Sequence, residues 1–232
     1  MTKKQRVLSI FNILKELYPD PKAELNASSD YEFLFAVIMS AQTTDKQVNK
    51  LTDTLFIKYP TLESFADAEI EQLALDMNSI GLYRAKAKNL ISTANTLILK
   101  FNSQVPNSIE DISSLDGAGR KTANVVTGDW FKNNQGIAVD THVMRLCKNF
   151  GLSKHIDPLK IEQDLMKLFP KAHWSMMSLR LILYGRYYFP AHLYEHDGPL
   201  SEYVVRQNLE KRRKVIKIKK IKNIISPIKK TK

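Results

Sequence analysis

The chain has 232 residues, 44% of them hydrophobic, which is enough for one large or two small domains with packed cores. No apolar run approaches the roughly 20 residues that a membrane-spanning helix needs, and the first residues do not lead into the apolar core of a signal peptide. The single cysteine, Cys147, excludes an internal disulfide framework and any metal site built from four thiolates. The cytoplasm is therefore the expected compartment.

The net charge of +11 is concentrated at one end of the chain. Of the 35 Lys and Arg residues, 11 lie in 211–232, where there is no Asp or Glu, so the rest of the chain carries 24 basic and 24 acidic residues. Such a basic tail is typical of nonspecific attraction to nucleic acid or an anionic surface, and also of a simple solubilising end. Specific residues, and not overall charge, must therefore identify the partner.

Helical periodicity extends through nearly the whole chain, because apolar residues recur three or four positions apart. We expect Asp45 and Asp140 to act as N-caps, since Asp is favoured at that position. We find no convincing pair of β-strands, so the predicted fold is all-α with roughly ten helices. The predicted helices cover 7–17, 33–39, 45–56, 62–67, 69–78, 83–101, 109–115, 120–131, 141–150, 158–169 and 175–186.

Residues 115–124, with the sequence Leu-Asp-Gly-Ala-Gly-Arg-Lys-Thr-Ala-Asn, form the most informative motif. Two helices joined by so short a loop need glycine, because the chain must adopt positive φ and let another backbone come close. The exposed N–H groups at the start of the second helix suit a DNA phosphate. A bare Gly-x-Gly would be read as an ordinary corner between helices, but the Arg-Lys-Thr-Ala-Asn that follows favours a phosphate site.

Lys121 and Asp140 supply the chemistry that this motif suggests. A helix N-terminus, the neighbouring Arg120 and partial desolvation would each favour the neutral amine that attack on carbon requires. Lys121 could then attack the sugar C1′ of a damaged nucleoside, forming a Schiff base and cutting the strand by β-elimination. Asp140 could act only as a helix cap, or could also stabilise positive charge at C1′. His142 is close in sequence, but it is more often structural or phosphate-facing and is not assigned to catalysis.

Five stretches occur in the order and spacing of the endonuclease III family, within the helix-hairpin-helix (HhH-GPD) DNA glycosylase superfamily, and the chain resembles that family over about residues 1–190. They are Met39–Asp45, Ile80–Ala87, Gly117–Val126, Ile137–His142 and Leu183–Tyr187. The resemblance implies a six-helix barrel domain at 23–134, a second helical domain from 1–22 and 135–205, a DNA-binding cleft between them, and a basic tail at 206–232.

The resemblance also implies the roles of individual residues. Lys121 would be the nucleophile and Asp140 the essential carboxylate. Gln42 and Leu82 would enter the duplex around a flipped-out nucleotide, since an amide can hydrogen-bond an orphaned base and leucine can wedge a base stack. The residues expected to contact the DNA backbone are Gly117, Gly119, Arg120 and Thr122. The expected partner is double-stranded DNA containing damaged bases or abasic sites, bound by a monomer away from membranes, in the nucleoid if the source is bacterial.

The sequence departs from its relatives where they hold a four-iron, four-sulfur cluster on four cysteines. The corresponding positions here are Phe189, His196, Pro199 and Val205. Phe, Pro and Val cannot replace thiolates, so no cofactor and no metal site are expected. Aromatic side chains could pack in the cluster's place, and the candidates are Tyr187, Tyr188, Phe189 and Tyr194. Two further departures are Asp116, where relatives have proline, and Ser113, where they often have an acidic residue; both bear on DNA affinity.

The predicted function is an enzyme of base-excision DNA repair: a bifunctional DNA glycosylase and apurinic/apyrimidinic lyase acting on oxidised pyrimidines. A glycosylase/lyase of the 8-oxoguanine type is an alternative, because that branch also uses lysine and aspartate. The segment Ala41–Asp45 favours the pyrimidine branch. A noncatalytic helix-hairpin-helix DNA-binding protein is the alternative of a different class, motivated by the missing cysteines.

Overall fold

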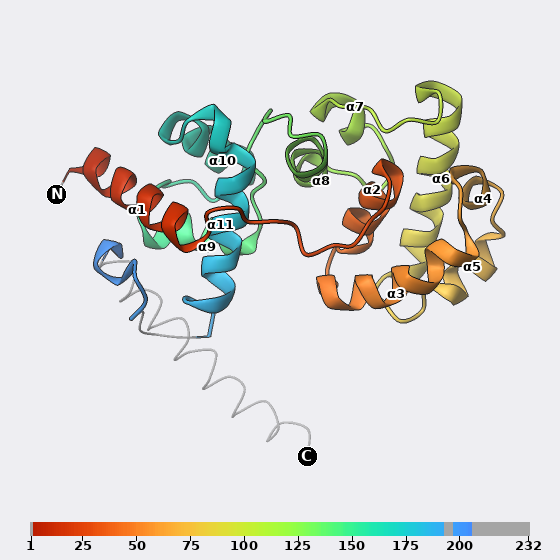
Figure 1. The fold of residues 1–232 in the computed structure, drawn as a ribbon, viewed down its shortest axis with the longest axis horizontal. Coiled ribbons are helices and arrows are strands. Elements are labelled where there is room, and N and C mark those ends of the chain that lie inside the picture. Colours follow the sequence, from red (N-terminus) through yellow and green to blue (C-terminus); the bar gives the residue numbers. More distant parts are fainter. Residues whose placement is uncertain (1, 193–196, 206–232) are drawn as a thin grey trace, which may run out of the picture. The chain divides into compact units, whose positions relative to one another are not determined.

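The computed structural model describes residues 2–192 and 197–205, and every regular element in these ranges is helical (Figure 1). The predicted all-α class is therefore confirmed. The basic tail 206–232, Tyr194 and His196 lie outside the described residues. Within the described ranges, no helix has the length and apolar character that crossing a membrane would require.

The chain divides into two compact units. The central unit contains Lys22–Ala138 and Lys171–Ser175. The terminal unit contains the residues up to Pro21, Val139–Pro170 and the described residues from Met176 onward.

The central unit is built around α2 (Asp30–Met39), whose residues from Phe33 to Met39 are all buried. A helix that is apolar on every side must be covered on every side. The helices that follow it are α3 (Asp45–Lys58), α4 (Leu62–Ala66), α5 (Ile70–Asp76), α6 (Tyr83–Phe101), α7 (Ile109–Ser113) and α8 (Arg120–Val125). The last of these continues as a π-helical segment, Val126–Trp130, so the predicted single α-helix over 120–131 is wrong in its second half.

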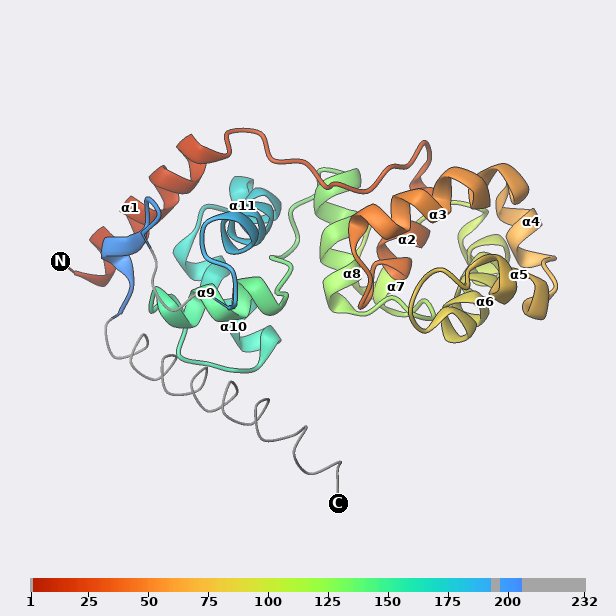
Figure 2. The same ribbon diagram turned by 90° about the horizontal axis from the view of Figure 1, so that it is seen from below.

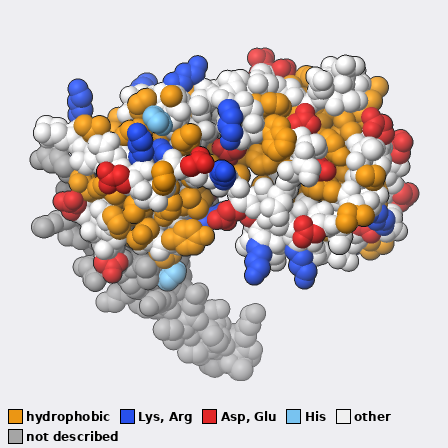
Figure 3. All heavy atoms as spheres, viewed as in Figure 1, with side chains coloured by type: hydrophobic (Ala, Val, Ile, Leu, Met, Phe, Trp, Pro, Cys, Tyr) orange, Lys and Arg blue, Asp and Glu red, His pale blue; other side chains and the backbone are white. Residues whose placement is uncertain are grey.

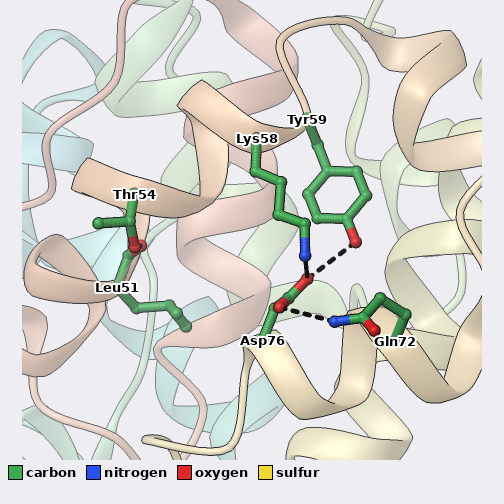
Figure 4. Close-up of polar contacts among 6 residues, drawn as sticks. All are labelled: Leu51, Thr54, Lys58, Tyr59, Gln72 and Asp76. Carbon is green, nitrogen blue, oxygen red and sulfur yellow. Dashed lines mark hydrogen bonds and ion pairs between the residues drawn. The ribbon is translucent and has the colours of Figure 1, made fainter.

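The helices α4 and α5 pack against α6, as Figures 1 and 2 both show. A hydrogen-bonded cluster fixes α5 to the end of α3 (Figure 4). The Asp76 carboxylate accepts hydrogen bonds from Lys58 Nζ at 2.6 Å, the Tyr59 hydroxyl at 2.9 Å and Gln72 Nε2 at 3.1 Å. Burial alone would raise the pKa of Asp76, but these three donors together lower it below its usual value. Burial, with the bond to Asp76, raises the pKa of Tyr59 to about 12.

The N-cap of α3 is Thr44, so the prediction that Asp45 caps this helix is wrong. The Thr44 hydroxyl accepts a hydrogen bond from Gln47 N at 3.3 Å, and the Gln47 side chain reaches back to the Thr44 N–H. This reciprocal pair is a capping box, which satisfies two backbone donors where a lone aspartate would satisfy one. Asp45 becomes the first residue of the helix, where its charge still complements the helix dipole.

The terminal unit contains α1 (Lys3–Leu17), α9 (Thr141–Asn149), α10 (Pro158–Leu168) and most of α11 (Trp174–Tyr187). Segments from the two ends of the chain meet at Arg180, which is 1% exposed. Its Nε donates to Tyr18 O at 2.8 Å, and its Nη2 donates to Pro19 O at 2.9 Å. Arg180 therefore fastens the carbonyl end of α1 to α11.

Candidate functional site

The glycine hairpin at 116–119 is seated on the side of α6. The Asp116 backbone carbonyl accepts a hydrogen bond from Thr93 Oγ1 at 2.9 Å, and its carboxylate accepts one from Ser92 Oγ at 2.5 Å. Gly117 has φ +78°, and a Cβ built there would lie 2.7 Å from Asn89 Nδ2. Glycine is therefore required at 117 by both conformation and space. The hairpin accommodates the Asp116 carboxylate because this group accepts a hydrogen bond from Ser92 of α6.

Gly119 differs from Gly117, because a Cβ built at Gly119 would have no atom within 4 Å. Gly119 is the N-cap of α8, and the first backbone bond of the helix runs from Ala123 N to Gly119 O at 3.0 Å. The N–H groups ahead of Ala123 therefore point out of the helix end. Open space around the residue that begins the helix is what a phosphate group needs for a close approach.

The first turn of α8 presents the predicted contact residues on its surface. Arg120 and Lys121 are exposed, Thr122 is half-buried, and Ala123 is completely buried against the unit's core. The short side chain of Ala123 lets this turn pack closely against the core of the unit. Lys121 lies on the exposed side of the same turn.

Asp140 is the N-cap of α9, as predicted. Its Oδ1 accepts a hydrogen bond from Val143 N at 2.8 Å, and the residue is half-buried. Lys121 belongs to the central unit and Asp140 to the terminal unit. The pairing of their side chains therefore stays a prediction. The two residues that can supply an amine and a carboxylate are each well defined within their own unit.

His142 makes its contacts within the terminal unit. Its Nδ1 lies 3.3 Å from Arg145 Nη2, and the same Arg145 nitrogen donates to Gly185 O at 3.1 Å. A Cβ built at Gly185 would lie 2.9 Å from His142 Nδ1, so α9 and α11 are in close contact here. These contacts agree with a structural role for His142.

Gln42 and Leu82 lie on two loops of the central unit that touch each other. Both residues have positive φ, +56° and +58°, although neither is glycine. A Cβ built at Gly81 would lie 3.9 Å from Gln42 O, which places the two loops in contact. Leu82 is 58% exposed, and Gln42 is also exposed. The contact between the loops brings these two predicted residues together. Their left-handed backbone is strained, as at functional sites, but Asn102, Ser103 and Lys132 adopt it too.

Lys86 supports the same pair of loops and was not among the predicted site residues. It is 4% exposed, and its Nζ donates to Thr43 Oγ1 at 2.9 Å. Its position in the sequence held a signal: it stands four residues before Leu90, on the face of α6 that also buries Ala87, Ala94 and Leu97. A lysine on that face must be buried, and a buried lysine needs an acceptor.

On the side of the molecule that Figure 3 shows, charge alone does not single out a DNA-binding face. Figure 3 shows basic and acidic side chains interspersed on the face in view. This agrees with the equal numbers of acidic and basic residues outside the tail. The DNA-binding assignment therefore rests on the hairpin and on the two strained loops.

The residues present do not fit an iron–sulfur cluster. Phe189 is fully buried and lies under the Arg145 guanidinium, 5.5 Å from ring centroid to Cζ. The only thiol, Cys147, is buried, and burial raises its pKa, whereas a cluster needs four thiolates. In the described part of the chain, no three His, Cys, Asp or Glu side chains gather as metal ligands would.

Aromatic and aliphatic side chains pack together around the end of α11. Leu200 is fully buried, and its N–H donates to the Tyr184 hydroxyl at 2.8 Å. Tyr188 stacks on Tyr184 with centroids 5.2 Å apart. Of the side chains expected to take the cluster's place, Phe189 is fully buried and Tyr188 is 38% exposed; that they lie where the cluster would sit stays a prediction. Tyr187 is 66% exposed, so the expectation is wrong for that residue.

Comparison with known proteins identifies the class. Residues 35–171 match the sequence profile described as HhH-GPD superfamily base excision DNA repair protein. Endonuclease III of Synechocystis sp. is 41% identical over 80% of this chain and 84% of its own length. Endonuclease III of Rickettsia felis is 39% identical over 86% of this chain and 93% of its own length.

Solved structures show the same relationship. A non-covalent endonuclease III–DNA complex superposes with a TM-score of 0.84 at 38% identity, covering 92% of this chain and all of that one. A trapped endonuclease III–DNA covalent intermediate gives a TM-score of 0.83 at 38% identity, with the same coverage. The 8-oxoguanine DNA glycosylase of Thermotoga maritima shares only the fold, with a TM-score of 0.52 at 19% identity over 81% of this chain and 89% of that one.

The chain therefore belongs to the HhH-GPD superfamily of base excision DNA repair proteins and, within it, to the endonuclease III family. It is an enzyme, a base-excision DNA glycosylase and apurinic/apyrimidinic lyase, and the noncatalytic alternative is not favoured.

Proposed function

We propose that this enzyme removes oxidised pyrimidines from double-stranded DNA, using Lys121 as nucleophile and Asp140 as the essential carboxylate. The observation that carries the proposal is the start of α8. There an exposed Lys121 follows directly on an open, glycine-capped helix end suited to hold a phosphate. One element thus offers both an anchor for the DNA strand and an amine beside it.

The chemistry follows from these groups. After losing a proton, the Lys121 amine attacks the sugar C1′, and the bond from C1′ to the base breaks as the base leaves with the bonding electrons. Opening of the sugar gives a protonated Schiff base, which acidifies the C2′ proton. Loss of that proton expels the 3′ phosphate by β-elimination, and water then hydrolyses the imine and frees the lysine. Asp140 stabilises the positive charge that develops at C1′ or takes the proton that the amine loses.

The DNA is held by different groups from those that react. Gly117, Gly119, Arg120 and Thr122 contact the backbone without reading sequence. Gln42 and Leu82 enter the duplex, where the amide bonds the base left without a partner and the leucine fills the gap in the stack. Because both loops are exposed and in mutual contact, they can enter at one step of the duplex.

We further propose that the enzyme works without an iron–sulfur cluster, as a monomer, and in the nucleoid of a bacterial cell. The buried Phe189 and Leu200 and the Tyr184 hydroxyl supply packing where relatives are expected to bind the cluster. The purified protein should be colourless and free of iron. Iron bound in stoichiometric amount, with visible absorbance, would contradict this part of the proposal.

Borohydride trapping on DNA with an abasic site tests the catalytic assignment. The wild type should form a covalent adduct, and Lys121→Ala should form none. Lys88→Ala is the matched control, because Lys88 is an exposed lysine of α6 outside the proposed site. If the wild type forms no adduct, or if Lys121→Ala still forms it, the assignment is wrong.

Asp140→Asn separates chemistry from capping. Asparagine is as good an N-cap as aspartate, so the variant should keep the bond to Val143 N and unfold at nearly the wild-type temperature. Base release should nevertheless fall by about a hundredfold or more, as is usual when a charge-stabilising or proton-transferring group is removed.

The preferred substrate is tested by comparing the rates of base release from duplexes that carry a single oxidised pyrimidine or a single 8-oxoguanine. Faster release of 8-oxoguanine would favour the alternative.

A further inference from the structure

Lys86 is a buried cation whose side chain donates a hydrogen bond to a neutral hydroxyl group. It is 4% exposed, and burial lowers its pKa. Among the described residues, no carboxylate is in ion-pair contact with it, and Nζ donates to Thr43 Oγ1 at 2.9 Å. Burying an ammonium group without a counter-charge works against folding. Packing alone therefore gives no reason for lysine at this position.

The contacts of Lys86 show what it connects. Its backbone N–H donates to Leu82 O at 3.0 Å, and its side chain donates to Thr43, the residue after Gln42. The main-chain bond belongs to the first turn of α6 and would form with any residue but proline, so it is the side chain of Lys86 that links the Gln42 loop to the start of α6. Both loops contain a non-glycine residue in left-handed conformation, which persists only where neighbouring contacts hold it.

We propose that Lys86 is a positioning residue that locks the Gln42 loop to the Leu82 loop, so that both side chains enter duplex DNA as one preformed wedge. The inference rests on the proposed function, which assigns Gln42 and Leu82 to the duplex. Lys86 does not itself touch DNA, because it is buried beneath the loops. Its contribution is to remove the loop ordering that binding would otherwise require.

Two changes remove the bond from opposite ends. Lys86→Met keeps most of the side-chain volume and removes the charge, and Thr43→Val keeps the shape of threonine and removes the acceptor. Thr43→Ser restores a hydroxyl and is the rescue variant. Lys88→Ala, an exposed lysine two positions along the same helix, is the control. Each variant is assayed by single-turnover borohydride trapping on an abasic site, in a duplex and in the same strand without its complement.

Trapping on the duplex should slow about five- to tenfold in Lys86→Met and in Thr43→Val, the effect expected when one hydrogen bond no longer fixes a loop. The double variant should be no slower than Thr43→Val alone, since both changes break the bond between Lys86 and Thr43, and Thr43→Val also removes the 3.5 Å bond from the Thr43 hydroxyl to Ala41 O. Thr43→Ser and Lys88→Ala should trap at the wild-type rate. On the single strand, which has no base stack to wedge, the loss should be absent.

Thermal unfolding supplies the readout that a merely structural role would not give. Lys86→Met should unfold at the same temperature as the wild type or higher, because a buried, unpaired charge has been removed. A stable variant that is slow only on duplex DNA supports the proposal. Wild-type rates on the duplex, equal losses on both substrates, or a lower unfolding temperature that accounts for the loss would overturn it.

Failure of the proposed function would look different, because then either the wild type would trap on neither substrate or Lys121→Ala would still trap. Leu82→Ala completes the set and should show the same duplex-specific loss as Lys86→Met. A wild-type duplex rate for Leu82→Ala would remove the wedge itself and with it the positioning role of Lys86.

Discussion

Gly117 and Gly119 belong to the same hairpin, but the structure predicts opposite consequences when each is changed to alanine. At Gly117 the left-handed conformation costs an alanine about 1 kcal/mol. The added Cβ also lies 2.7, 3.0 and 3.1 Å from Nδ2, Cβ and Cγ of Asn89. Moving that side chain away costs about another 1 to 2 kcal/mol. Gly117→Ala should therefore destabilise the central unit by about 2 to 3 kcal/mol, which lowers the unfolding temperature by about 4 to 12 °C for a chain of this size.

Gly119→Ala should leave stability nearly unchanged, with a loss below about 1 kcal/mol for the poorer N-cap. Its methyl group meets no protein atom within 4 Å. A methyl group at the residue that begins α8 narrows the approach of the proposed phosphate to the helix N-terminus. DNA affinity should therefore fall. The two effects are measured by thermal unfolding and by titration with duplex DNA at fixed salt.

Asn89→Ala separates the two contributions at Gly117. It removes the two Asn89 atoms at 2.7 and 3.1 Å and should recover about half of the lost stability in the double variant. The reasoning would be refuted if Gly119→Ala were as destabilising as Gly117→Ala, or if Gly119→Ala bound DNA as tightly as the wild type.

Two further predictions concern buried hydrogen bonds. Asp76→Asn should lower the free energy of unfolding by about 1 to 2 kcal/mol at neutral pH, because three donors converge on the carboxylate. The pKa of Asp76 is lower in the folded protein, so its carboxylate stabilises the fold fully above the usual value of 3.8 and loses this effect as the pH falls through the folded pKa. In urea titrations, the difference in unfolding free energy between wild type and Asp76→Asn should therefore disappear in that acid range. A difference that is independent of pH would contradict the assignment. Tyr184→Phe should lower the free energy of unfolding by about 1 to 3 kcal/mol, because Leu200 N loses its acceptor. Tyr187→Phe is the control and should have no measurable effect, because that ring is exposed. Equal effects of the two changes would rule out the proposed packing at Tyr184.

The order and type of the helices could be read from periodicity, because burial of one face recurs with the helical repeat. The Asp140 cap could also be read from the sequence, although Thr141 beside it is another favoured capping residue. At α3 the competing signal was present but overlooked: Thr44 and Gln47 have the spacing of a capping box, which prevails over Asp45. The rule that a hydroxyl followed three residues later by Gln or Glu marks a helix start would have found it.

Other features depend on contacts distant in sequence and could not be read locally. The π-helical turn at 126–130 lies where Gly128 packs closely against Ser175, which is 47 positions away in the sequence. No local sequence pattern predicts that contact. The positive φ of Leu82 also gives no local signal, because leucine ordinarily avoids this conformation. Lys86 was a partial exception, since its place on the buried face of α6 was visible in the spacing.

The unusual main-chain angles at Gln42 and Leu82 have a consequence for anyone who wishes to make this enzyme more durable. Glycine or asparagine adopts these angles with less strain, so either substitution should relieve on the order of 1 kcal/mol and raise heat tolerance. A screen that scores survival of heating alone would therefore enrich such changes and discard the two side chains proposed to enter the duplex. A selection for heat tolerance should therefore also require activity on duplex DNA in the same round.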